Sequence, residues 1–310
     1  MIHEYALDPA VLLSWAGNDR DYAEFFREYG LGTPRIISSF PKKKASKLRS
    51  YLLQHSPQNK QSKQAQRYME MVVKLVETIV LRDVPDNQPQ NWRDAAKIEN
   101  ERTHHQFGAV LSAAPIATGK NITPANMYNQ NSIWNHPRQI DIQRTNDGFM
   151  SAVSNLIRLS TQQIVIVDAF GWKYNAIQLI QCIANAISRN RIHNQLPSIC
   201  LFYKEKLRSR NSSSASPSPE QVKAQIFQGL NTDVSKIQLR VAELREIPGN
   251  DVFHNRCILT EHGGVSIGHG IDVSGDYAHS DEAFLFAEPI YKKKWRQFVE
   301  VPCFEIVSEA

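Results

Sequence analysis

The last two-thirds of the sequence alternates apolar runs of strand length with segments of helical periodicity, and this alternation constrains the fold more than any other feature. Helices that connect neighbouring strands pack on the faces of the sheet that the strands form. The sequence therefore predicts an α/β fold with a mixed, mostly parallel sheet and helices on both faces. The expected helices are 149–159, 174–188 and one that begins at Ser218, and the expected strands are 164–167, 199–203 and 237–241.

The first third of the chain has a different pattern. Apolar residues recur every three or four positions between residues 62 and 81, which predicts an amphipathic helix. Shorter helices are expected at 19–29 and 92–104, and residues 121–145 are expected to form a loop. We therefore predict a helical region over residues 1–105 and an α/β domain over residues 106–310.

Positive charge is concentrated in the helical region. Between Arg35 and Lys74 there are ten basic residues and a single acid, Glu70, although the whole chain has a net charge of only +5. Such one-sided clustering is typical of a surface that binds phosphates, although a solvated helical surface gives the same pattern. The residues predicted to contact nucleic acid are Lys42, Lys43, Lys44, Lys47, Lys63 and Arg67.

Other features of the composition exclude several classes of protein. The four cysteines are widely spaced and show no zinc-binding pattern, which favours free thiols in a reducing cytoplasm. No apolar run approaches the roughly 18 residues of a membrane helix, and the N-terminus contains no secretory signal pattern. The sequence also lacks a glycine-rich phosphate loop, so no nucleotide cofactor is expected.

The stretch from residue 252 to residue 271 contains the strongest candidate site. His254 and Arg256 are two positions apart, so a strand would place both side chains on one face. A Gly-Gly turn at residues 263–264 separates this expected strand from a second one, and Glu261 and His269 flank the turn. The pattern predicts a β-hairpin that presents a histidine beside a cation.

This stretch resembles the signature of the phospholipase D-like phosphodiesterases, His-x-Lys, four residues, Asp, six residues, Gly-Ser-x-Asn. His254 and Gly268 match it, Arg256 takes the Lys position and Glu261 the Asp position. His269 and Ile271 replace the Ser and the Asn. Asp168-Ala-Phe170 is similar to a tripeptide that often follows a neighbouring strand in these proteins.

The resemblance implies a metal-independent nuclease in which His254 is the nucleophile, with catalytic support from Arg256, Glu261 and His269. The family mechanism uses a second histidine, and the sequence has no second copy of the motif. A homodimer would bring two copies of His254 together. By analogy, a role in bacterial antiphage defence with partner proteins is also expected.

Three alternatives remain open at this stage. The substituted motif is also compatible with an inactive subunit that binds nucleic acid or scaffolds a larger assembly. A metal site at His262, His269, His279 and Asp281 is a second alternative. An acidic nuclease centre is the third, formed by Asp272, Asp276, Asp281 and Glu282.

Overall fold

A computed structural model of the chain forms two compact units. The first contains Met1–Arg138 and Asn190–Asn194, and the second contains Gln139–Arg189 and Gln195–Ala310. The described residues are 1–102, 104, 106–127, 129, 133–189, 191–207, 215–231, 233–254, 256–274, 278–301 and 303–310.

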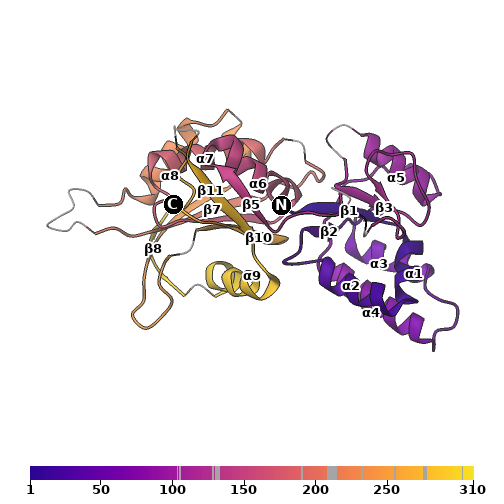
Figure 1. The fold of residues 1–310 in the computed structure, drawn as a ribbon. Coiled ribbons are helices and arrows are strands. Elements are labelled where there is room, and N and C mark those ends of the chain that lie inside the picture. Colours follow the sequence, from indigo (N-terminus) through magenta and orange to yellow (C-terminus); the bar gives the residue numbers. More distant parts are fainter. Residues whose placement is uncertain are drawn as a thin grey trace. The chain divides into compact units, whose positions relative to one another are not determined.

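The first unit contains the expected helices and, in addition, a sheet that the sequence pattern did not reveal (Figure 1). Its strands lie in the order β2-β1-β3-β4, and all pairs are parallel. The strands are β1 (His3–Leu7), β2 (Arg35–Ile37), β3 (Ala109–Leu111) and β4 (Asn121–Ile122), and the helices are α1 (Pro9–Ala16), α2 (Asp19–Glu28), α3 (Ala45–Gln54), α4 (Lys63–Glu77) and α5 (Trp92–Glu101).

The position of β3 explains why the first unit extends beyond residue 105, where the sequence predicted a domain boundary. β3 pairs with β1 along Tyr5–Leu7, so the chain returns to the N-terminal sheet after α5. Tyr5 and Leu7 pack against the helices α1 to α4, whereas Ala6 belongs to a second core cluster that includes Trp92 of α5. Because β1 is buried on both faces, it lacks the apolar and polar alternation by which a half-buried strand is detected.

A buried ion cluster connects this sheet to α5. The Arg82 guanidinium donates to Glu4 Oε1 of β1 at 2.8 Å and to Glu99 Oε1 of α5 at 2.7 Å. Arg82 and Glu4 have no exposed side-chain surface, and Glu99 has 2%. The Arg82 guanidinium also lies 4.0 Å from the centre of the Phe107 ring. Each buried charge thus has an opposite partner, which burial requires.

The second unit is built on a mixed eight-stranded sheet, in the order β12-β8-β7-β6-β9-β10-β11-β5. β6, β7 and β8 are parallel, and the other pairs are antiparallel. The strands are β5 (Gln139–Gln143), β6 (Gln163–Val167), β7 (Ser198–Lys204), β8 (Leu239–Arg245), β9 (Cys257–Thr260), β10 (Gly263–Ile267), β11 (Ser280–Leu285) and β12 (Glu305–Glu309).

Helices cover both faces of this sheet, which confirms the predicted α/β class. α6, α7 and α8 pack in a row on one face, and α9 lies on the other (Figure 1). The helices are α6 (Asn146–Leu159), α7 (Tyr174–Ala186), α8 (Pro219–Gln228) and α9 (Glu288–Trp295), with a short 3₁₀ helix, η1 (Val234–Lys236), and a short π-helix, η2 (Arg296–Glu300).

Two features of the sequence include residues that the structure does not describe. The segment 209–219 is rich in serine and proline, a composition that predicts a loop, and its residues 209–214 lie outside the described part of the chain. Asp276, a candidate for the acidic centre, lies outside it as well. In the described residues, no helix combines the length and the apolar character needed to cross a membrane.

Candidate active site

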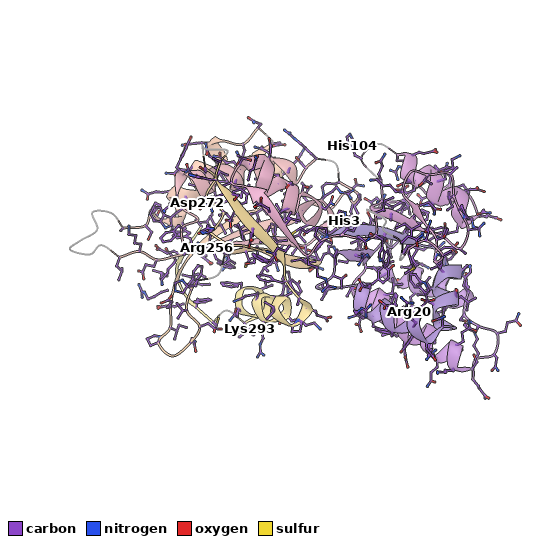
Figure 2. All side chains as sticks on the ribbon, in the orientation of Figure 1. His3, Arg20, His104, Arg256, Asp272 and Lys293 are labelled. Carbon is purple, nitrogen blue, oxygen red and sulfur yellow. The ribbon has the colours of Figure 1, made fainter. Side chains whose placement is uncertain are left out.

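The β9–β10 hairpin holds the residues of the sequence motif. Cys257 pairs with Ser266 and Thr260 with Gly263, so the strands are antiparallel and the turn contains Glu261. The prediction that His254 and Arg256 lie on the strand was wrong, because β9 begins at Cys257. His254 instead lies in an irregular segment, and the His254 backbone N–H donates to the carbonyl of Val252 at 3.0 Å. Figure 2 shows Arg256 on this unit, with Asp272 also labelled.

Glu261 lies at the opposite end of β9 from Arg256. At about 3.3 Å per strand residue, the two are about 16 Å apart along the chain. Glu261 accepts hydrogen bonds from Ser160 Oγ at 2.7 Å and from the backbone of Gln162 at 3.1 Å, both in the loop between α6 and β6. Burial raises the pKa of Glu261, but the charge of His262 and the hydrogen bonds from the Thr161 backbone and the Ser160 side chain outweigh burial and lower it. Its contacts hold the hairpin turn against the rest of the unit.

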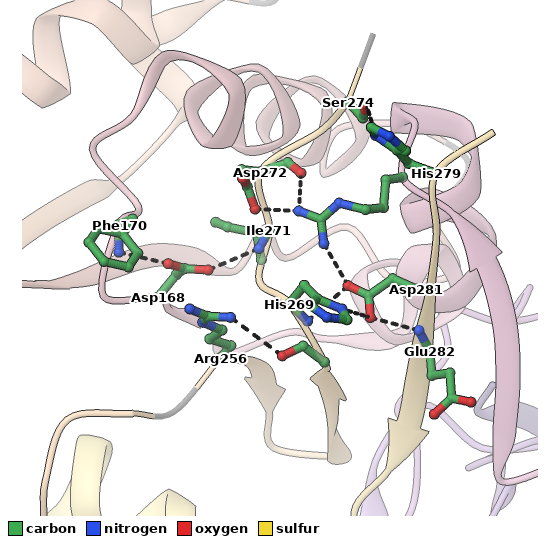
Figure 3. A network of polar contacts seen from close by, with 12 residues as sticks. Asp168, Phe170, Arg256, His269, Ile271, Asp272, Ser274, His279, Asp281 and Glu282 are labelled. Atoms are coloured by element: carbon green, nitrogen blue, oxygen red, sulfur yellow. Dashed lines mark hydrogen bonds and ion pairs between the residues drawn. The ribbon is translucent and has the colours of Figure 1, made fainter. Parts of the chain in front are cut away.

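His269 follows β10 and is bound to a buried carboxylate (Figure 3). Its Nδ1 lies 3.1 Å from Asp281 Oδ1, and its backbone N–H donates to Asp281 Oδ2 at 2.9 Å. The His269 side chain is 79% exposed, whereas the Asp281 side chain is 2% exposed. Gly268 permits this approach, because a Cβ there would lie 2.6 Å from Asp281 Oδ1. Asp281 thus orients the imidazole through Nδ1, and the other ring nitrogen, Nε2, faces solvent.

Arg144 supports Asp281 from the other side. Its Nη1 donates to Asp281 Oδ2 at 2.8 Å, and its Nη2 binds the carbonyl of Asp272 at 2.7 Å and also the Asp272 carboxylate. Burial alone raises the pKa of Asp281. The backbone N–H groups of His269 and Glu282, the His269 ring and the Arg144 charge outweigh burial, so the pKa of Asp281 is lowered. Asp281 is therefore an anion at neutral pH.

A second buried carboxylate, Asp168, lies at the end of β6 beside Arg256 (Figure 3). It accepts from the backbone N–H of Phe170 at 2.7 Å and from that of Ile271 at 2.9 Å. Burial raises the pKa of Asp168, and these hydrogen bonds and the Arg256 charge oppose the increase only in part. Gly270 has φ +106°, and a Cβ there would lie 2.6 Å from Asp168 Oδ2. The two carboxylates thus hold the Gly-His-Gly segment from both ends.

The other motif residues have different positions. Arg256 Nη1 lies 3.5 Å from the carbonyl of Gly268, which puts its guanidinium at the base of the His269 segment. Ile271, at the Asn position of the motif, is fully buried. His254 is exposed. The pKa of Glu246 is lowered, chiefly by a hydrogen bond from Lys204, and His254 makes a smaller electrostatic contribution to this decrease. In the described residues, no hydrogen bond joins His254 to His269.

This arrangement has the parts of an acid–base and nucleophilic centre. A carboxylate that accepts the Nδ1 proton of a histidine keeps Nε2 unprotonated, so Nε2 is available to attack an electrophile or to accept a proton. Arg256 supplies a fixed positive charge near the ring. Over the described part of the chain, no group of three or more His, Cys, Asp or Glu side chains has a geometry suited to a metal ion.

The predicted nucleic-acid-binding residues fall into two groups. Lys42, Lys43, Lys44 and Lys47 line a groove of about 810 Å³ on the first unit, which we call the lysine groove. Most residues between Val84 and Trp92 line its other side. Lys63 and Arg67 lie outside it, on α4, where both pair with Asp19 of α2. The four groove lysines surround the first turn of α3, which contains no acid.

Sequence reasoning missed Arg144 completely and did not assign Asp281 to His269. Arg144 falls in the segment 121–145 that was predicted to be a loop, but part of it forms β5. β5 pairs with β11, with Gln143 opposite Ser280, and this pairing brings Arg144 to Asp281. The Gly-His-Gly sequence was a usable signal, because glycines on both sides of a polar residue indicate close backbone approach.

Comparisons with known proteins give no family for this chain. No family model matches the sequence, and no curated protein matches it either. The solved structures that are similar over about half of the chain include two that illustrate the likeness. One is TrmBL2, an archaeal chromatin protein with a novel mode of DNA binding, with TM-score 0.29 and 12% identity over 56% of each chain. The other is Nuc from Salmonella typhimurium, a phospholipase D family member, with TM-score 0.28 and 11% identity over 52% of this chain and 91% of that chain. Likeness at this level supports no inference about function.

Proposed function

We propose that the chain is a metal-independent phosphodiesterase of phospholipase D-like type that acts on nucleic acid, with His269 as its nucleophile. One observation carries the proposal: the exposed imidazole of His269 is bound through Nδ1 to the buried Asp281, which Arg144 holds in place. The nucleophile predicted from the motif was His254, whose ring has no such partner in the described residues. Orientation by a buried carboxylate favours His269.

The proposed reaction has two steps. His269 Nε2 attacks phosphorus, a nitrogen–phosphorus bond forms, and the bond from phosphorus to the leaving oxygen breaks. Arg256 stabilises the negative charge on the phosphoryl oxygens as it develops. A water molecule then attacks phosphorus and releases His269. The products are an alcohol and a phosphate monoester, so each cleavage consumes one water molecule.

The leaving oxygen needs a proton, and His254 is the proposed donor. Cys257 pairs with Ser266, and the Ile267 N–H donates to the Arg256 carbonyl at 3.0 Å. His254 precedes β9 by three residues and His269 follows β10 by two, so both histidines flank the same end of the hairpin. With both histidines in one chain, the reaction does not require two subunits. Dimerisation stays a prediction.

Nucleic acid is the proposed substrate because of the charge of the first unit. The lysine groove offers four ammonium groups, and Lys42 lies 4.9 Å from the centre of the Tyr51 ring. Lys43 is paired with Asp86 at 2.6 Å, while Asp86 is 92% exposed and the pair is open to solvent. A groove with this charge attracts a polyanion. A role in antiphage defence stays a prediction.

The test is cleavage of a fluorescently labelled oligonucleotide in the presence of EDTA. We expect the parent protein to cleave, and His269→Ala to abolish cleavage. His254→Ala should lower the rate by about 10²- to 10⁴-fold, the usual contribution of a general acid. His104→Asn is the matched control, since His104 is exposed and lies in the first unit. Full activity of His269→Ala would refute the assignment, and loss of activity with EDTA would refute the metal-independent mechanism.

A specific observation favours a second function, nucleic-acid binding without catalysis. Three carboxylates lie around the Gly-His-Gly segment, against two guanidinium groups from Arg144 and Arg256, and this excess opposes the approach of a phosphate. The carboxylates are those of Asp168, Asp272 and Asp281. In this case the lysine groove would be the functional site, and the chain would serve as a subunit of a larger assembly.

A salt titration tests the lysine groove directly. The slope of log K against log salt should be about −0.9 for each phosphate contacted in duplex DNA. Changing Lys42, Lys43, Lys44 and Lys47 together to Glu should weaken binding to all sequences alike and flatten the slope. Lys63→Glu is the control, because Lys63 lies outside the groove. An affinity that does not depend on the groove lysines would refute a role for the groove.

A further inference from the structure

The loop that follows β6 presents aromatic rings and lysines beside the His269 centre. It runs Phe170-Gly-Trp-Lys173 and leads into Tyr174, the first residue of α7, and we call these five residues the aromatic loop. We propose that the aromatic loop stacks on unpaired bases, so that the substrate is single-stranded nucleic acid. This inference rests on the proposed function and specifies its substrate class.

The first observation is the exposure of two rings. Phe170 is 41% exposed and Tyr174 is 74% exposed. Large aromatic side chains bury most of their surface in a folded protein, so two exposed rings four residues apart are informative. Every nucleobase has a π-face that can stack on such a ring, whatever the sequence.

The second observation is the charge that accompanies the rings. Lys173 Nζ lies 4.5 Å from the centre of the Phe170 ring, and Lys206 Nζ lies 6.0 Å from that of Trp172. In a single strand, bases alternate with phosphates, so a ligand of this kind requires rings and cations close together. An apolar partner would leave both ammonium groups without a counterion. The combination therefore favours a polynucleotide over a protein surface.

The third observation is that the aromatic loop is fixed to the candidate site. The Phe170 N–H donates to Asp168 Oδ1, the Gly171 N–H donates to the Asp168 carbonyl at 3.0 Å, and Asp168 Oδ2 accepts from Ile271. Figure 3 shows Phe170 and Arg256 on adjacent sides of Asp168. A base on the Phe170 ring would thus bring its phosphate close to Arg256, the proposed stabiliser of the phosphoryl oxygens.

These features select single strands over duplexes. In a duplex the faces of the bases are covered by their neighbours, so a protein ring reaches them only after unstacking. In a single strand the faces are available, and each base stacked on a ring strengthens binding by about 5- to 150-fold. The aromatic loop is held by backbone hydrogen bonds before the ligand arrives, so little ordering is needed on binding.

The experiment compares two labelled strands of about 12 nucleotides, a length that single-strand-binding domains occupy. One carries thymine bases and the other is abasic with the same phosphates. We expect the parent protein to bind the thymine strand at least about tenfold more tightly. Tyr174→Ala and Phe170→Ala should remove most of this preference and leave abasic binding unchanged. Tyr174→Phe, which keeps the ring, should retain it.

Two controls make the result decisive. Phe26→Ala removes a ring of similar exposure, 37%, from the first unit and should have no effect. Melting temperatures show whether each variant is folded, and because both loop rings are exposed we expect little change. Equal affinity of the parent protein for the two strands would overturn the inference, and so would an unchanged preference in both alanine variants.

The same samples separate this inference from the proposed function. A thymine preference that depends on the aromatic loop, without any cleavage, would refute the phosphodiesterase and support the stacking role. Cleavage that is abolished in His269→Ala but is equally fast on thymine and abasic strands would support the phosphodiesterase and overturn the stacking role.

Discussion

Replacing Asp281 with Asn should destabilise the second unit and disrupt the candidate site without changing the size of the side chain. The two Asp281 oxygens accept from Arg144 Nη1, from His269 Nδ1 and from the backbone N–H groups of His269 and Glu282. An amide has one oxygen, so its NH₂ group faces donors. The Arg144 bond loses its charge partner, and at least one N–H is left unsatisfied.

The magnitude follows from these losses. A hydrogen bond to a charged group contributes about 1.5–3 kcal/mol, and a buried unsatisfied donor costs about 1–3 kcal/mol. We therefore expect a loss of about 3–5 kcal/mol at neutral pH, as is usual when one partner of a buried pair is removed. The folded pKa of Asp281 is below its ordinary value of 3.8. The difference between parent and variant should thus be complete above the unfolded pKa and disappear as the pH falls through the folded pKa.

Hydrogen exchange measured by mass spectrometry gives the appropriate assay, because it reports on each unit separately. Amides of β10 and β11 should exchange at least about 10²-fold faster in Asp281→Asn, since each 1.4 kcal/mol is a factor of ten. Asp272→Asn is the matched control. Asp272 binds the same Arg144, but its side chain is 41% exposed, so we expect a loss below about 1 kcal/mol. Equal effects of the two substitutions would refute the argument.

Two further predictions concern buried groups. Arg82→Met should destabilise the first unit by about 3–5 kcal/mol, because it leaves two buried carboxylates without their shared cation; urea unfolding measures this, and Arg102→Met, at a residue 35% exposed, should cost below about 1 kcal/mol. Burial raises the pKa of Cys200 and of Cys257 to about 12, so in the native protein at neutral pH iodoacetamide should label both far more slowly than the half-buried Cys182 and Cys303. Rapid labelling of Cys257 would contradict the burial of the β9 strand.

The parts of the fold that could be predicted are those with a local signal. The strands at 163–167 and 198–204 are largely continuous apolar runs between helical patterns. Three of their four predicted ends differ from the observed ends by one residue, and the fourth coincides. β1 gave no such signal, because His3 and Glu4 begin it and its partners β2 and β3 are distant in sequence. Its polar residue Glu4 is tolerated in the core only because Arg82, 78 positions later, neutralises it.

The candidate site shows the same division. The spacing of His254, Arg256, Glu261 and His269 indicated a hairpin, and the hairpin is present. The roles of these residues depend on contacts that spacing does not encode. Asp281 reaches His269 through the pairing of β10 with β11, and Glu261 faces the loop after α6 because β9 pairs with β6. Long-range strand pairing therefore determines which of the motif residues has a buried partner.

The central claim is that His269 is the nucleophile, and a trapped intermediate tests it most directly. Protein mixed with an oligonucleotide is quenched in base, where nitrogen–phosphorus bonds survive, and is then digested with trypsin. Cleavage after Arg256 separates His254, in the peptide 246–256, from His269, in the peptide 257–292. We predict a phosphonucleotide adduct on His269 in the second peptide and its absence in His269→Ala. An adduct on His254 instead, or active protein that never carries an adduct on either peptide, would contradict the assignment.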